Sequence, residues 1–487
     1  MKNKQTLFQR VYDDLHEQIV TERLACGTVL PSMRMMCDFY HVGIRTMKDV
    51  MARLREEGYI RTEERKHAVV IYDKGITDKD FAARSVLEYK TCILDVCETM
   101  FWIMPPIFSF SAAVCRDEET KKWETVLKNM YRKEPAVRTK ILLSFLNQFL
   151  EQSGNFLVRD LYASLELYAK MPLFQNYKEL ETHILTYNEF NSAKWVMEAL
   201  VSRDGPETER RLGIMYEAVR YGIGRQLYRL SREFPDIQEK GSSVFTFDIR
   251  YERNAFYMQI VRDLIDKIGA GVYRVGAYLP PEAVLAENYG VCISTVRRAL
   301  AMLNEIGFAK TYNAKGTMVI WQEDEAIEKC MKNKNLKMET LLYLSSLQLM
   351  AIIIKPAAVL AFPYIDETDK NSMKARSDHA EALLFEDIIR CVTDRQTLPP
   401  LKIILESIGE LIISGYYYSM LCDGPSSDET LTVMAKEACG YLYAGDVSHF
   451  SAHLSKCYCH ILNYVRDYMI KCGLSEAKKI VTPYTIE

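Results

Sequence analysis

Apolar residues recur at helical spacing along most of the chain, and near its start they predict three short helices in succession. Ser32 can cap the second of these helices while Pro31 restricts its entry, and Gly58 ends the third as a left-handed cap would. Two short apolar runs at 59–60 and 68–71 then predict a β-hairpin. The inward faces of the three helices are Val11, Leu15, Ile19 and Val20; Met35, Met36 and Phe39; and Met47, Val50, Met51 and Leu54.

The same pattern returns once, at a constant distance along the chain. Pro280 and Gly307 lie 249 residues after Pro31 and Gly58, and the register holds without a gap through the whole unit. A repeat of this kind indicates duplication of one structural module. Three helices followed by a hairpin predict a winged helix-turn-helix domain, whose third helix can enter the major groove of DNA.

The two long segments outside these modules have helical periodicity and a fainter internal similarity. Residues 97–113 resemble 350–363, each apolar and interrupted by proline, and apolar spacing near residue 150 resembles that near 410. We therefore expect a mainly α chain in which two winged helix-turn-helix domains alternate with two all-helical domains, as an internal tandem duplication. The expected domains are residues 1–75, 76–246, 247–323 and 324–487.

Both small modules resemble the GntR family of bacterial regulators. The family module typically reads LPSERELA, then a turn like GVSRTTVREAL, a helix ended by glycine and a GxGT wing. Here LPSMRMMCDFYHVGIRTMKDVM and LPPEAVLAENYGVCISTVRRAL follow that frame. The resemblance implies double-stranded DNA as the partner and transcription regulation as the function.

The candidate DNA contacts lie on the third helix and the wing of each module, and Arg34 of the first module adds the family's LPSER arginine on the second helix. Short hydroxyl side chains near a helix N-terminus suit phosphates, and Arg or Lys reaches guanine edges or the backbone. Ile44 and Ile293 replace the family's arginine in VSR, and the wing at 66–68 lacks both family glycines, so we expect the second module to be the stronger reader. The candidates are Arg34, Arg45, Thr46, Lys48 and Lys66 in the first module, and Ser294, Thr295, Arg297, Arg298, Lys315 and Gly316 in the second.

Composition places few limits on this interpretation. The formal net charge of −3 does not indicate nucleic-acid binding, although it leaves room for local basic faces. Thirteen cysteines, an odd number, occur without a repeated CxxC pair, which favours a reduced cytoplasmic location. The basic start is followed by no apolar run, so no signal peptide is expected. Residues 341–365 are apolar and long enough to span a membrane, but Gln348, Lys355 and two prolines favour a buried core helix, so no membrane association is expected.

The helical segments contain no arrangement of residues that indicates catalysis. Cys457, Cys459 and His460 lie close in sequence without convincing zinc-ligand spacing, so we expect no metal, no cofactor and no enzyme activity. Phe101, Trp102, Phe108 and Phe110 flank a proline pair. If helices break there, a pocket would open for a mostly apolar small-molecule effector.

Two functional hypotheses follow from the sequence. In the first, the chain is a sequence-specific DNA-binding regulator whose halves form an internal pseudo-dimer on an asymmetric operator, with a homodimer left open. In the second, it is a non-enzymatic interaction or scaffold protein in which one or both modules bind DNA weakly or have lost binding. Steep salt dependence of DNA binding distinguishes the two.

Overall fold

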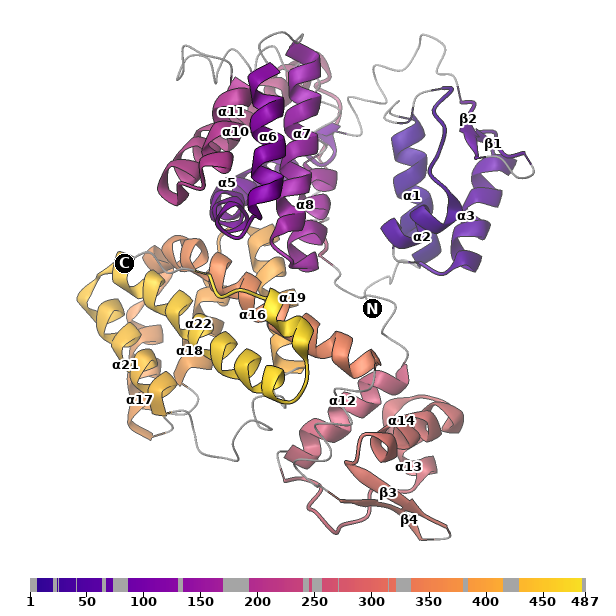
Figure 1. Ribbon diagram of the computed structural model, residues 1–487, viewed down its shortest axis with the longest axis vertical. Coiled ribbons are helices and arrows are strands. Elements are labelled where there is room, and N and C mark those ends of the chain that lie inside the picture. The colour runs from indigo at the N-terminus through magenta and orange to yellow at the C-terminus, as the bar shows by residue number, and fades with distance from the viewer. Residues whose placement is uncertain are drawn as a thin grey trace.

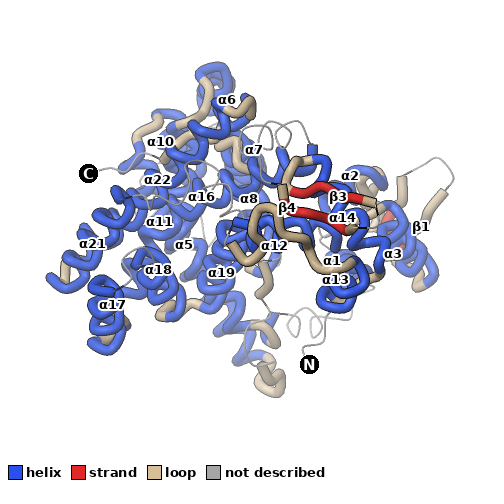
Figure 2. The backbone as a smooth tube through the Cα atoms, turned by 90° about the horizontal axis from the view of Figure 1, so that it is seen from below, coloured by secondary structure: helices blue, strands red, loops and turns tan. Residues whose placement is uncertain are grey.

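The chain is mainly α-helical, and the strands of its described part belong to two small hairpins (Figures 1 and 2). This computed structural model describes residues 7–20, 24, 26–40, 42–63, 67–72, 86–129, 135–169, 192–239, 245–247, 256–269, 271–313, 315–320, 334–379, 384–414 and 429–483.

The first winged module contains three helices and a two-stranded hairpin. Val11, Leu15, Met47 and Leu54 are buried in a hydrophobic cluster of its own, which the structure separates from the rest of the described core. Its elements are α1 (Leu7–Val20), α2 (Met33–Tyr40), α3 (Ile44–Glu56), β1 (Ile60–Arg61) and β2 (Val69–Val70).

The second winged module repeats the first in register. Ile60 pairs with Val70 in one hairpin, and Ala309 pairs with Val319 at the same positions of the other. The cap glycine Gly58 and its counterpart Gly307 have φ angles of 81° and 83°, which confirms the predicted left-handed ends of the third helices. The elements are α12 (Phe256–Gly269), α13 (Glu282–Tyr289), α14 (Ile293–Glu305), β3 (Ala309–Tyr312) and β4 (Gly316–Val319).

Each helical segment is arranged around one long apolar helix. In the first segment α5 packs on α7, α8 and α11, and in the second α16 packs on α18, α19 and α22. The first segment comprises α5 (Lys90–Ala113), α6 (Asp117–Asn129), α7 (Pro135–Gln152), α8 (Phe156–Tyr168), α10 (Ser192–Ser202) and α11 (Gly205–Glu233). The second comprises α16 (Lys334–Ala361), η3 (Phe362–Tyr364), α17 (Glu367–His379), α18 (Leu384–Asp394), α19 (Pro399–Ser414), α21 (Glu429–Ala444), α22 (Val447–Lys471) and η5 (Ser475–Lys479).

The two helical segments also pack on each other. The helix α5 contacts α16 directly. The helix α8 of the first segment contacts α16 of the second, and α19 of the second segment contacts α5 of the first. Asn155, at the start of α8, adds hydrogen bonds from its Nδ2 to the Ser345 carbonyl and to Gln348 Oε1 of α16, each 2.8 Å long. These three side chains are buried, so the polar contact lies inside the shared core.

The helices do not break at Pro105, Pro106 or Pro356, so the condition for a pocket at these prolines is not met. The helix α5 runs through Pro105 and Pro106, and α16 runs through Pro356. Interior proline removes a backbone hydrogen bond and usually bends or ends a helix. Here burial of most of α5, including Phe108 and Phe110, favours the continuous helix over that local cost.

Within the described residues, two apolar helices are long enough to cross a membrane, at 90–113 and 337–364, and both are mostly buried inside the protein. Their apolar side chains form the centre of the helical core, as the sequence indicates for residues 341–365. The core helix of a soluble domain meets the same test of length and composition.

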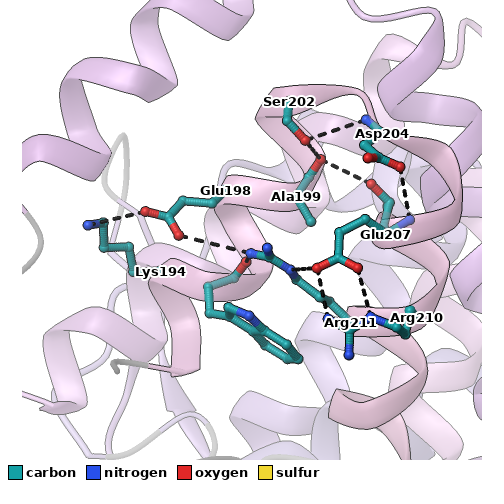
Figure 3. Close-up of polar contacts among 10 residues, drawn as sticks. Lys194, Glu198, Ala199, Ser202, Asp204, Glu207, Arg210 and Arg211 are labelled. Carbon is teal, nitrogen blue, oxygen red and sulfur yellow. Dashed lines mark hydrogen bonds and ion pairs between the residues drawn. The ribbon is translucent and has the colours of Figure 1, made fainter. Parts of the chain in front are cut away.

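A compact set of polar contacts begins α11 (Figure 3). Asp204 caps the helix by accepting a hydrogen bond from the Glu207 backbone N–H at 3.0 Å. Glu207 in turn accepts hydrogen bonds from Arg210 and Arg211, and these bonds lower the pKa of Glu207 to about 2. Arg211 also donates to the Trp195 carbonyl of α10, which ties the two helices together.

The Glu207→Gln substitution should lower stability in a pH-dependent way. Because the folded-state pKa is depressed, the carboxylate's contribution is present above the unfolded pKa near 4.5 and lost as the pH falls through about 2. The pairs are partly solvated, so we expect an effect below about 1 kcal/mol at pH 7. The difference in melting temperature should stay constant from pH 7 to about pH 5 and shrink as the pH falls from about 4.5 to about 2. A gap that is constant with pH, or an equal effect of the control Glu124→Gln on the exposed face of α6, would contradict this role.

An ion pair joins the second winged module to the helical core. Arg262 of α12 donates to both carboxylate oxygens of Glu339 on α16, at 2.9 and 2.7 Å. Glu339 is buried and Arg262 is nearly so. Among the described residues, the second module belongs to the large hydrophobic cluster of the helical core, and the first module has a cluster of its own.

Candidate nucleic-acid interface

The third helix of the first module has one face in the core and one toward solvent. The inward face consists of Met47, Val50, Met51 and Leu54, as the periodicity predicts. Arg45 and Lys48 are exposed on the outward side, and Thr46 is half-buried between the two faces. This basic surface can reach phosphates or base edges.

The third helix of the second module has the same division with different residues. Ser294, Arg297 and Arg298 are exposed and Thr295 is half-buried. Serine and arginine thus stand where the first module has Arg45 and Lys48. The inward face consists of Val296, Ala299, Leu300, Met302 and Leu303.

A second helix fixes the position of Arg297. Its Nε donates a hydrogen bond to Glu282 Oε2 of α13 at 2.7 Å, while most of the side chain stays exposed. The carboxylate holds the guanidinium at the surface and leaves other N–H donors available for a ligand. In the first module Met33 stands at the Glu282 position, so Lys48 has no equivalent acceptor there.

Arg298 is engaged within its own module. Its guanidinium lies 4.0 Å from the centre of the Tyr257 ring of α12, a cation–π contact. In the first module Arg53 makes a comparable contact with Tyr12 at 4.5 Å and also pairs with Glu57. We assign these arginines a part in holding α14 and α3 against the first helices, in addition to any contact with a phosphate.

The wings differ between the modules in what the structure describes. Lys315 and Gly316 lie exposed at the turn between β3 and β4, and Gly316 has a φ of 102° that favours glycine. Lys66 lies outside the described residues, and so does the side chain of Arg34 on α2. The structure brings Arg45 with Lys48, and Ser294 with Arg297, onto single helix faces.

Three residues near the candidate contacts were not singled out as site residues from the sequence. Ile44 and Ile293 are the first residues of the third helices α3 and α14, and their side chains are exposed. Cys292 directly precedes α14. Cys292 Sγ lies 3.1 Å from the hydroxyls of Ser294 and Thr295, and these hydrogen bonds lower the pKa of its thiol to about 7. The sequence feature that points to these residues is their alignment with the serine and arginine of the family's GVSR turn, just before the third helix.

The space between the third helix and the wing holds a pocket in the first module and a polar link in the second. A cavity of about 380 Å³ is lined there by Met36, Met51, Lys48, Arg55 and other residues. At the corresponding place in the second module, Asn304 donates to Thr311, and Thr311 contacts Thr317 at 2.9 Å between hydroxyls. Arg55 and Ala68 replace Asn304 and Thr317, which removes this polar link.

The cysteines Cys457 and Cys459 of α22 have buried thiols. Burial raises the pKa of the Cys457 thiol to about 12 and that of Cys459 to about 11, so both remain protonated near neutral pH. Within the described residues, no three His, Cys, Asp or Glu side chains come together as a metal site.

Comparison with known families matches both small modules. The model of the bacterial regulatory proteins of the gntR family matches residues 7–70 and 256–319, which places two copies 249 residues apart, as the repeat does. Both small modules of this chain are therefore gntR-family modules. The third helices α3 and α14 and both hairpins belong to these matched modules.

Curated GntR relatives are similar over one module. The probable fructoselysine utilization operon transcriptional repressor of Escherichia coli K12 is 34% identical over 76 residues, covering 16% of this chain and 31% of the relative. The Exu regulon transcriptional regulator of the same strain is 35% identical over 69 residues, covering 14% and 27%. The chain therefore spans about a third of the length of the curated relatives it matches.

Solved GntR structures are similar only at low scores. Streptococcus agalactiae GntR is 15% identical with a TM-score of 0.24, covering 44% of this chain and 99% of that one. Escherichia coli McbR/YncC is 17% identical with a TM-score of 0.23, covering 43% and 97%. Similarity at this level adds no argument about the interface.

Proposed function

We propose that this chain is a GntR-family, sequence-specific DNA-binding transcription regulator of the cytoplasm that reads an asymmetric operator. The observation that supports this most is the duplicated reading helix with two different exposed faces, Arg45 with Lys48 and Ser294 with Arg297. A symmetric dimer presents identical helices to a palindromic site. Two different helices in one chain favour two different half-sites.

We also propose that the two halves act as an internal pseudo-dimer. The reciprocal contacts of α8 with α16 and α19 with α5 support this, because a two-fold interface uses the same surfaces on both partners. In the proposed complex one chain binds one operator, with one winged module on each of its two half-sites.

We further propose that the helical segments bind a mostly apolar small-molecule effector. This is supported by the position of α16, which contacts α5 and also holds α12 through Glu339. A ligand that prefers one arrangement of α16 would therefore shift the second module as well.

DNA binding should be strongly salt-dependent and sensitive to Arg297. Loss of one phosphate or base contact typically costs about tenfold in affinity, and loss of a phosphate contact reduces the salt slope by about one. We expect Arg297→Ala to produce such a loss in fluorescence anisotropy with DNA fragments from around the protein's own gene. The matched control is Arg390→Ala, since Arg390 on α18 is also an ion-paired arginine with a 68% exposed side chain, like Arg297.

The salt titration also tests the alternative function. A scaffold or interaction protein would bind the fragments weakly, with a shallow salt slope that Arg297→Ala leaves unchanged. Equal losses for Arg297→Ala and Arg390→Ala would also contradict the proposed interface.

A further inference from the structure

The first residue of each reading helix is an exposed isoleucine. Ile44 begins α3 with 52% of its surface exposed, and Ile293 begins α14 with 42% exposed. The two positions correspond in the repeat. Single exposed apolar residues are ordinary on protein surfaces, so the exposure alone carries no conclusion.

The neighbouring residues show that both isoleucines lie on the basic face of their helix. Ile44 lies four residues before Lys48, and Ile293 lies four residues before Arg297, so each isoleucine shares a helix face with an exposed cation. The intervening exposed position differs between the copies, with Arg45 in one and Ser294 in the other. Isoleucine is thus common to two helices whose neighbouring outward positions have diverged.

The N-terminal turn of a reading helix is the part that meets base edges in the major groove. An isoleucine side chain has no hydrogen-bond donor or acceptor, and it leaves polar base atoms that it covers without a partner. The one apolar group on the major-groove edges is the C5 methyl of thymine. An isoleucine side chain at this position therefore favours a base pair that presents the thymine methyl group.

We propose that Ile44 and Ile293 each contact the C5 methyl of a thymine, so that both half-sites contain a thymine at matched positions. The inference depends on the proposed DNA-binding function and adds to it one base of the sequence that is read. The neighbouring base pairs then differ between the half-sites, because Arg45 and Lys48 face one and Ser294 and Arg297 face the other.

The test uses the full chain and removes one methyl group at a time. Binding sites are selected from a random duplex pool, and each thymine of the selected site is then replaced by deoxyuridine, which pairs alike and lacks the methyl. Burial of one methyl group corresponds to about a fourfold gain in affinity. We expect one thymine in each half-site to lose about this factor in anisotropy titrations of the wild-type protein.

The variants Ile44→Ala and Ile293→Ala assign each methyl to its helix. Each variant should bind thymine and deoxyuridine equally at one half-site and keep the difference at the other. The control Ile413→Ala removes an exposed isoleucine on α19, away from both modules, and should keep both differences. A variant that keeps its thymine preference at both half-sites overturns the assignment.

A gain of function completes the test. Arginine forms bidentate hydrogen bonds with guanine, so Ile293→Arg should change the preferred base at its half-site from thymine to guanine in a repeated selection. Selected sites that bind with a steep salt slope but show no methyl effect at any thymine overturn this inference and leave the proposed function standing. Failure to enrich any sequence, with a shallow salt slope, overturns both.

Discussion

The Glu339→Ala substitution is expected to lower the free energy of unfolding by about 3 kcal/mol, because it removes the buried carboxylate that accepts two hydrogen bonds from Arg262 between α12 and α16. Loss of one member of a buried pair typically costs about 3–5 kcal/mol, and the partial exposure of Arg262 places our value at the low end. Urea unfolding followed by far-UV circular dichroism measures the change.

A double variant separates this charge effect from lost packing. Replacing both members of the pair, as in Arg262→Leu with Glu339→Leu, removes both buried charges and should be less destabilising than Glu339→Ala alone. The control Glu367→Ala breaks an exposed pair with Lys370 on α17 and should change stability by less than about 0.5 kcal/mol. Equal effects of Glu339→Ala and Glu367→Ala would show that the buried pair contributes nothing particular.

The Asn155→Ala substitution is expected to cost about 2–3 kcal/mol at the contact between the helical segments. It removes two hydrogen bonds to α16, leaves buried acceptors on Ser345 and Gln348 without this donor, and deletes the bond that Asn155 Oδ1 accepts from the Leu157 N–H at 3.0 Å. Each buried hydrogen bond contributes about 1 kcal/mol, and a lost helix cap costs a similar amount. Thermal and urea unfolding both measure this loss.

The Asn155→Asp substitution distinguishes the two roles of the side chain. Aspartate keeps an oxygen for the Leu157 N–H but places a carboxylate oxygen against the acceptors of α16, so it should destabilise at least as much as alanine. If aspartate restores wild-type stability, only the cap matters and the contact between segments does not. The control Asn129→Ala, at the exposed end of α6, should change stability by less than about 0.5 kcal/mol.

The winged modules were predictable because their signals are local. Gly58 and Gly307 mark helix ends through a backbone conformation, and the apolar positions of α3 and α14 follow helical period within a few turns. The contacts between segments were not predictable in this way. Arg262 and Glu339 are separated by 77 positions in sequence, and nothing in either local pattern indicates the other.

The sequence shows the local effect of proline but not the burial that opposes it. The helices α5 and α16 continue through Pro105, Pro106 and Pro356 because their apolar side chains are buried. The sequence shows only that Ile44 and Ile293 replace the family's arginine. It does not show that both isoleucine side chains face solvent beside Lys48 and Arg297. Glu282 is similar, since its bond to Arg297 depends on the angle between α13 and α14.

The contacts between α5, α8, α16 and α19 join two halves of a single polypeptide, so their association does not depend on protein concentration. A regulator built from separate subunits loses its paired reading helices when it is diluted below its dimer dissociation constant. It can also exchange subunits with a related protein. In this chain dilution cannot separate the two halves, and each molecule keeps one copy of each third helix.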